Sequence, residues 1–158
     1  MTFEESSVWV KGRLQHANLA DVPKIERLVH VAYEKYISRI GRRPKPMLAD
    51  YGLAVANHQT WVVSNGESIS AVLELIPGPG FLLIENVAVD PLLQKSGYGS
   101  GLMHFAELEA KRQGLNELRL YTNERFTENI HFYKGIGYRE TYREPYKGTD
   151  IVHMAKTI

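Results

Sequence analysis

Residues 81–101 read FLLIENVAVDPLLQKSGYGSG: an apolar run, a proline, and then three glycines within five residues. The apolar run has the length and β-branched content of a buried strand, while LMHFAELEAKRQ at 102–113 has helical spacing. Gly97, Gly99 and Gly101 are therefore predicted at a strand-to-helix turn. A tight turn that needs positive φ explains one glycine, but three are better explained by an anion held against bare backbone at a helix N-terminus.

Three common motifs are absent from this turn. A P-loop needs a glycine-lysine pair followed by serine or threonine, and the chain has none. A dinucleotide fingerprint needs GxGxxG, whereas the glycines here give GxGxG. A nucleophile elbow needs a serine at the centre of GxSxG, and the central residue here is Gly99. The anion is thus predicted to be held in another way.

The run resembles the acyl-CoA-binding signature of the GNAT acetyltransferase superfamily, [QR]xxGx[GA] after a strand that ends V-A-V-x-P. The matching residues are Gln94, Gly97 and Gly99, after Val87 to Pro91. The resemblance covers nearly the whole chain and implies a single GNAT domain over residues 1–158. That domain has an α/β fold, with a mixed, mostly antiparallel sheet splayed at the cofactor cleft and helices on both faces. It implies acetyl-CoA as co-substrate.

A second stretch, residues 123–138, carries another pattern. Asn129 and Tyr133 are four residues apart, so on a helix they share a face; a cap and a half-buried ring are the alternative explanation. The stretch resembles the second GNAT motif, an asparagine followed four residues later by a tyrosine and then K-x-x-G-[FY]. The matching residues are Asn129, Tyr133, Lys134, Gly137 and Tyr138. Membership implies that Asn129 hydrogen-bonds the pantetheine arm and that the Tyr133 hydroxyl lies near the cofactor sulfur.

The resemblance also implies how the backbone holds the cofactor. The amides of residues 95–100 would hold the pyrophosphate, and the main chain of residues 87–89 would pair with the pantetheine like an added strand. The expected cofactor-binding residues are Val87, Ala88, Val89, Gln94, Lys95, Ser96, Gly97, Tyr98, Gly99, Ser100, Asn129 and Tyr133.

Such a site implies direct attack of an amine on the thioester. A lysine-like amine with a pKa near 10.4 is neutral in about one molecule in 2,500 at pH 7, a cost of about 4.6 kcal/mol that a base offsets in part. We expect Tyr133 to act as general acid for the leaving thiolate. Glu85 is the expected base, because alternation places it on the face of Val87 and Val89, where it would act directly or through water. A surface carboxylate or an ion-pair partner is the alternative, and Tyr121, Glu74 and His131 are weaker candidates.

The loop RRPKP at 42–46 is basic and stiffened by proline. GNAT proteins commonly build the acceptor site there, so Arg42 and Arg43 are candidate ligands for a carboxylate or phosphate on the acceptor. A solvated basic loop, or one that packs on a partner chain, is the alternative.

Composition limits the remaining functions. The 158 residues suit one domain, and 19 basic against 18 acidic side chains give no bulk field for nucleic acid. The chain has no cysteine, which suits a reducing cytoplasm, and its six histidines show no metal-ligand spacing. No signal peptide or membrane-length apolar run is found. The expected partner is a small-molecule or peptide amine, with a homodimer possible; a non-catalytic acyl-CoA sensor is the rival function.

The remaining elements are predicted from local patterns. A first strand over 8–17 precedes a long helix that is capped by Asp21 and ended by Gly41. A shorter helix over 47–57 leads into a hairpin with a type I′ turn at Asn65-Gly66. After the helix at 102–113 and its cap at Gly114, the expected elements are a strand at 116–122, a helix at 127–135 and strands at 137–144 and 150–158. The mixed order predicts a sheet covered on both faces.

Overall fold

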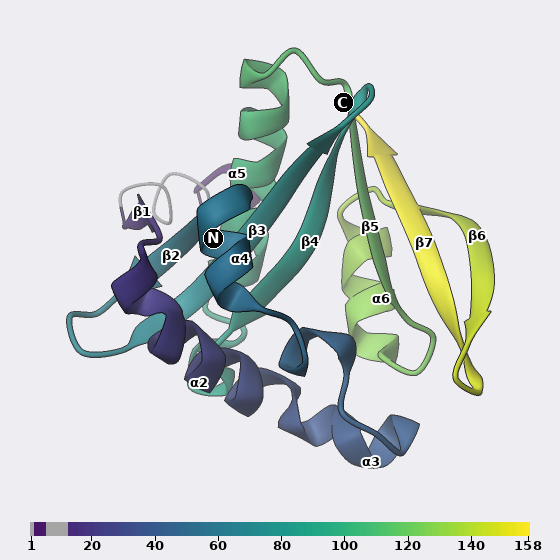
Figure 1. The fold of residues 1–158 in the computed structure, drawn as a ribbon. Helices are drawn as coiled ribbons and strands as arrows, with labels where there is room; N and C mark the ends of the chain where they lie inside the picture. The colour runs from purple at the N-terminus through teal and green to yellow at the C-terminus, as the bar shows by residue number, and fades with distance from the viewer. Residues whose placement is uncertain (1, 6–12) are drawn as a thin grey trace.

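The computed structural model describes residues 2–5 and 13–158 and contains one mixed sheet (Figure 1). Its seven strands lie in the order β1-β2-β3-β4-β5-β7-β6, and every neighbouring pair is antiparallel except β4 and β5. The strands are β1 Leu14–His16, β2 Gln59–Ser64, β3 Ile69–Gly78, β4 Phe81–Val89, β5 Glu117–Asn123, β6 Arg139–Tyr146 and β7 Thr149–Thr157. The predicted α/β fold with a mostly antiparallel sheet is confirmed. Residues 8–12 of the predicted first strand lie outside the described residues.

Helices cover both faces of the sheet, as predicted (Figure 1). The helices are α2 Val22–Tyr33, α3 Ile37–Ile40, α4 Tyr51–Asn57, α5 Tyr98–Arg112 and α6 Thr127–Gly135. On one face α2 and α4 pack on the sheet through a cluster that includes Ile25, Val62 and Val72. On the other face α5 packs through a larger cluster that includes Leu102 and Leu118 and extends to Tyr133 of α6.

The long first helix is interrupted, which the apolar spacing did not predict. A 3₁₀ turn, Glu34–Tyr36, separates α2 from α3, and Gly41 then ends the helical segment at a φ of 74°. Asp21 is not the side-chain cap of α2. Its carboxylate instead accepts a hydrogen bond of 2.9 Å from the backbone N–H of Asn18, which completes a capping box on the 3₁₀ turn Leu19–Asp21.

The β2–β3 hairpin has a longer turn than predicted. A type I′ turn needs positive φ at both central residues, and here Gly66 has a φ of 101° while Asn65 is not in the left-handed region. The Asn65 side chain accepts from the Ser68 amide at 2.9 Å, and the Asn65 amide donates to the Ser68 carbonyl at 3.0 Å. Asn65 therefore closes a four-residue loop between the two strands.

The sheet is splayed between β4 and β5. The two strands pair at only two positions, Leu82 with Leu118 and Leu83 with Arg119, both at the start of β4. Beyond Leu83, no residue of β4 pairs with a residue of β5. The predicted splay is confirmed, and it leaves backbone groups of β4 at the edge of a gap.

A β-bulge lies in β4 at Glu85. On β3, Glu74 pairs with Asn86 and Leu75 pairs with Ile84, so Glu85 is the extra residue. The bulge exchanges the two faces of the strand: Ile84 packs in the core beneath α5, and Val87 and Val89 pack against that same core. The predicted shared face of Glu85, Val87 and Val89 is therefore wrong, because alternation holds only without a bulge.

Candidate active site

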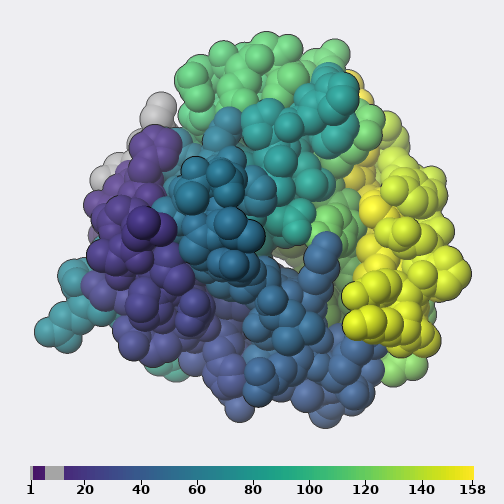
Figure 2. Space-filling model, in the orientation of Figure 1, coloured from purple at the N-terminus to yellow at the C-terminus, as the bar shows by residue number. Residues whose placement is uncertain are grey.

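A cavity of about 450 Å³ opens where β4 and β5 diverge. Its walls come from β4, β5 and α6, from the segment between α3 and α4, and from the β6–β7 turn. Figure 2 shows the surface hollowed between the blue segment that contains the 3₁₀ turn Lys45–Met47 and the yellow β6–β7 hairpin. The structure brings these predicted site residues to the cavity: Arg42, Arg43, Glu74, Glu85, Val87, Tyr121, Asn129 and Tyr133.

Tyr133 reaches the cavity from the buried face of α6. The residue is 9% exposed, and its ring lies against the rings of Phe132 and Tyr138, with centroids 5.6 and 5.9 Å away. Its hydroxyl has no hydrogen-bond partner among the described residues. Burial raises the pKa of Tyr133 well above its ordinary value, with a smaller contribution from Tyr36. The hydroxyl is therefore protonated at neutral pH and available as a donor.

Asn129 lies one turn before Tyr133 on α6, as the spacing predicts. Its side-chain oxygen accepts a long hydrogen bond of 3.5 Å from the Tyr36 hydroxyl. The Tyr36 ring stacks on Phe126 with the centroids 4.0 Å apart. The amide nitrogen of Asn129 is not used in this contact, so it can donate to a ligand in the cavity.

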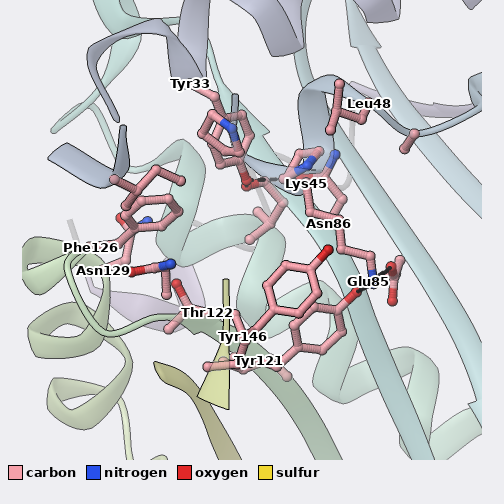
Figure 3. A pocket seen from close by; sticks show the side chains of 18 of the residues that line it. Tyr33, Lys45, Leu48, Glu85, Asn86, Tyr121, Thr122, Phe126, Asn129 and Tyr146 are labelled. Carbon is pink, nitrogen blue, oxygen red and sulfur yellow. Dashed lines mark hydrogen bonds and ion pairs between the residues drawn. The ribbon is translucent and has the colours of Figure 1, made fainter. Parts of the chain in front are cut away.

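Glu85 lies on the opposite wall, beside Tyr121 of β5 (Figure 3). Its Oε1 accepts from the Tyr121 hydroxyl at 2.5 Å, and Lys45 Nζ donates to the same hydroxyl at 2.7 Å. Lys45 Nζ is itself 4.0 Å from Glu85 Oε1. Burial, and then the hydrogen bond to Glu85, raise the pKa of Tyr121. Tyr121 is thus a neutral donor that fixes the Glu85 carboxylate, and the second carboxylate oxygen has no partner in this group.

Glu74 is a second carboxylate in the cavity, on β3. It is 4% exposed, and its Oε2 lies 2.6 Å from His58 Nδ1 at the end of α4. Burial raises the pKa of Glu74, and His58 opposes part of that shift. On the next strand, Asn86 accepts from the Tyr33 hydroxyl at 3.0 Å and donates to the Tyr51 hydroxyl at 3.0 Å. The sequence indicates Glu74 as a weaker candidate for the base, but its patterns do not indicate the rest of this polar wall, because the members are far apart in the chain.

The glycine turn lies beyond the cavity, at the start of α5. Helix α5 begins at Tyr98, earlier than the spacing predicted, and Gly97 precedes it at a φ of 91°. The Gly101 amide donates to the Gly97 carbonyl at 2.9 Å, so the helical amides ahead of Gly101 have no intrahelical acceptor. A Cβ at Gly99 would lie 3.8 Å from Phe132, an ordinary contact. Packing alone therefore does not require glycine at that position.

The two arginines of the basic loop differ in their contacts. Arg42 is half-buried and donates to the Lys147 carbonyl at 3.1 Å and to the Ile40 carbonyl at 3.4 Å. Arg43 is exposed and has no hydrogen bond or ion pair among the described residues. His131, a weaker candidate for the base, is exposed on α6 and does not line the cavity.

Two features are absent from the described residues. Within residues 2–5 and 13–158, no group of three or more His, Cys, Asp or Glu side chains is placed to hold a metal ion. In the same part of the chain, no helix is long and apolar enough to cross a membrane.

The splayed sheet, the glycine turn before α5 and the cavity between β4 and β5 together define an acyl-CoA-dependent acetyltransferase fold. The family described as "Acetyltransferase (GNAT) domain" matches residues 56–140, more than half of the chain. The chain therefore belongs to the GNAT acetyltransferases, which transfer an acetyl group from acetyl-CoA. No curated protein matches the chain significantly.

Solved structures are similar to this chain in fold at low sequence identity. The PaiA N-acetyltransferase from Thermoplasma acidophilum, in complex with coenzyme A, has a TM-score of 0.75 at 14% identity, covering 92% of this chain and 98% of that one. The ribosomal-protein-S18-alanine N-acetyltransferase from Escherichia coli has a TM-score of 0.69 at 18% identity, covering 92% of each chain. A GNAT family acetyltransferase from Elizabethkingia anophelis with acetyl-CoA bound has a TM-score of 0.66 at 18% identity, covering 92% and 99%.

Proposed function

We propose that this protein is an N-acetyltransferase that moves the acetyl group of acetyl-CoA directly to the amine of a small molecule or peptide. The observation that carries the proposal is the placement of Tyr133 and Glu85 in one cavity at the splay of the sheet. One of these side chains can donate a proton and the other can accept one. Two of the similar structures are named as N-acetyltransferases, which supports an amine as the acceptor.

The residues proposed to bind acetyl-CoA fit a ligand held by backbone. Beyond Leu83 the edge of β4 that faces β5 is without a strand partner, so the main chain of residues 87–89 can pair with the pantetheine. The turn at Gln94 to Ser100 precedes the 15-residue helix α5, whose N-terminal amides favour the pyrophosphate. Gly97, with a φ of 91°, allows the backbone to turn into that helix. Asn129 offers its amide nitrogen to the pantetheine arm.

The chemical step requires one proton acceptor and one proton donor. The acceptor amine attacks the thioester carbonyl, a C–N bond forms, the C–S bond breaks, and the amine proton leaves toward Glu85. The Tyr133 hydroxyl then donates to the departing thiolate. A reference thiol has a pKa of about 8.5, below that of Tyr133, so complete transfer from Tyr133 would be uphill and the hydroxyl acts chiefly as a hydrogen-bond donor.

Glu85 is proposed to accept the amine proton, directly or through a water molecule. Its Oε1 is held by Tyr121, so the carboxylate has a fixed orientation. Ile84 packs in the core under α5, so alternation directs Glu85 away from that core, and Glu85 lines the cavity. Glu74 is a weaker candidate, because it lies deeper and is already paired with His58.

The test is release of free CoA from acetyl-CoA across a panel of amines, with product mass confirming N-acetylation. Glu85→Gln keeps the side-chain volume and the acceptor oxygen for Tyr121, and we expect kcat/KM to fall about 10²- to 10⁴-fold. The rival function, a non-catalytic sensor, predicts tight acetyl-CoA binding by calorimetry with no CoA release above the uncatalysed rate. Failure to bind acetyl-CoA at all would exclude both functions.

A further inference from the structure

Cationic side chains from two distant segments line the cavity at exposed positions, which we call its mouth. Arg43 comes from the loop after α3, and Lys147 comes from the turn between β6 and β7. Arg42 holds the two segments together, because its guanidinium donates to the Lys147 carbonyl at 3.1 Å and lies 3.5 Å from the Thr149 hydroxyl. The sequence patterns indicated the first segment only. The β6–β7 turn adds a cation that lies 104 positions further along the chain.

The aromatic ring of Tyr146 adds to this arrangement. Arg42 Cζ lies 5.5 Å from the ring centroid and Lys147 Nζ lies 5.2 Å from it. A ring face attracts cations, so Tyr146 favours the presence of both side chains at the mouth. It supplies no negative charge to either of them.

The cations at the mouth lack counter-charges. Among the described residues, no carboxylate lies within ion-pair distance of Arg42, Arg43 or Lys147. The carboxylates of the cavity are held elsewhere: Glu85 by Tyr121, Glu74 by His58, and Glu144 by His153 at 2.6 Å. The mouth therefore carries positive charge that the protein itself does not neutralise.

Resting on the proposed function, we propose that Arg43 and Lys147 bind an anionic group of the acceptor, so that the substrate is a small amine that carries a carboxylate or a phosphate. Arg42 is a positioning residue, because three hydrogen bonds within the protein already fix its guanidinium. The amine end of such a substrate faces the carboxylate of Glu85, while its anionic end stays at the mouth. Arginine and lysine are the side chains that bind carboxylate and phosphate most strongly.

The same charges disfavour polycationic acceptors. A polyamine or aminoglycoside would place a second ammonium beside Arg43 and Lys147, where like charges repel. A neutral amine would leave both cations without a partner. The expected order of kcat/KM is therefore anionic amine first, neutral amine second and polycation last.

Matched acceptors test this order. β-Alanine against β-alaninamide isolates a carboxylate, and 2-aminoethyl phosphate against ethanolamine isolates a phosphate; putrescine represents the polycations. In at least one of the two pairs, we expect the anionic amine to exceed the neutral amine by about tenfold or more in kcat/KM. The pair that shows this difference identifies the anion as a carboxylate or a phosphate. Equal rates within both pairs, or a preference for putrescine, would overturn the proposal.

Charge-removing variants test the residues. Arg43→Gln keeps the chain length, and Lys147→Asn suits the left-handed backbone at a φ of 49°, where asparagine is tolerated. Each should raise the KM of the anionic acceptor about three- to tenfold and leave that of acetyl-CoA unchanged. Arg27→Gln, which removes an exposed cation of α2 outside the cavity, is the control for net charge. An unchanged acceptor KM in the double variant would contradict the assignment.

A binding measurement separates this proposal from the proposed function. Calorimetry of the CoA-loaded protein with 2-aminoethyl phosphate and with β-alanine should show an affinity that weakens with added salt and is lost in the double variant. If that affinity is found but no amine is acetylated, the proposed function fails and the anion site stands. If neutral amines are acetylated and neither anion binds, the anion site fails and the N-acetyltransferase function stands.

Discussion

The Tyr133→Phe variant gives the sharpest test of the proposed chemistry, because it removes one oxygen atom. The Tyr133 hydroxyl has no hydrogen-bond partner among the described residues, so its loss leaves no unpaired group behind. The ring keeps its contacts with Phe132 and Tyr138. We therefore expect the free energy of unfolding to change by less than about 0.5 kcal/mol.

The same change should have a large effect on turnover. Loss of a hydrogen-bond donor to developing negative charge lowers kcat about 10²- to 10³-fold, which corresponds to about 2.7–4 kcal/mol in activation free energy. Because burial raises the pKa of Tyr133, the wild-type rate should show no decline from its deprotonation up to the ordinary tyrosine value of about 10. The assay is steady-state CoA release between pH 6 and about 10 with acetyl-CoA in excess.

Tyr138→Phe is a matched control for the same chemical change. Its ring belongs to the same core, and its hydroxyl is buried without a hydrogen-bond partner among the described residues, but it does not line the cavity. Its kcat should equal that of the wild type. If Tyr133→Phe and Tyr138→Phe have the same kcat, the assignment of Tyr133 as the donor is wrong.

Three other predictions concern the glycine turn, the second carboxylate and Arg42. Gly97→Ala forces alanine to a φ of 91°, so we expect a loss of about 1 kcal/mol in denaturant unfolding and a higher Kd for acetyl-CoA by calorimetry; an unchanged Kd would contradict the backbone cradle. Burial raises the pKa of Glu74, so the folded protein favours its protonated form. The contribution of protonated Glu74 to the free energy of unfolding is complete below the unfolded pKa of about 4.3 and is lost as pH rises through the folded pKa. Glu74→Gln should therefore gain stability relative to wild type as pH rises from about 4, and parallel curves would refute the shift. Arg42→Ala should lower the free energy of unfolding by about 1 kcal/mol, because Arg42 ties the loop after α3 to the Lys147 carbonyl; no change in the chemical denaturation midpoint would show that this link is not stabilising.

Much of the fold follows from local patterns. The strand at Phe81–Val89 and the helix α6 have boundaries close to those predicted, whereas α5 begins at Tyr98, ahead of the predicted start at 102. The 3₁₀ turn at Glu34–Tyr36 is not, because its residues continue the helical spacing and only their hydrogen bonding differs. The Asn65-Gly66 pair was correctly located between two strands, but its turn type depended on the Ser68 contact three residues away.

The candidate site was predictable only where a motif marks it. Asn129 and Tyr133 share a helix face, and that relation can be counted from the sequence. Alternation along β4 predicts that Glu85 shares a face with Val87 and Val89, but a bulge at Glu85 breaks that alternation. No glycine or proline at that position marks the bulge in the sequence. Lys147 was missed altogether, since its place beside Arg42 depends on how β6 and β7 add to the far side of the sheet.

The two-residue pairing between β4 and β5 has a mechanical consequence. Through the sheet, β1 to β4 and β5 to β7 are coupled at Leu82 and Leu83 alone, so each half has its own well-paired set of strands. A ligand that binds between β4 and β5 and hydrogen-bonds to the β4 edge would link the two halves of the sheet. Ligand binding should therefore slow amide hydrogen exchange across the whole domain, including in strands that do not contact the ligand.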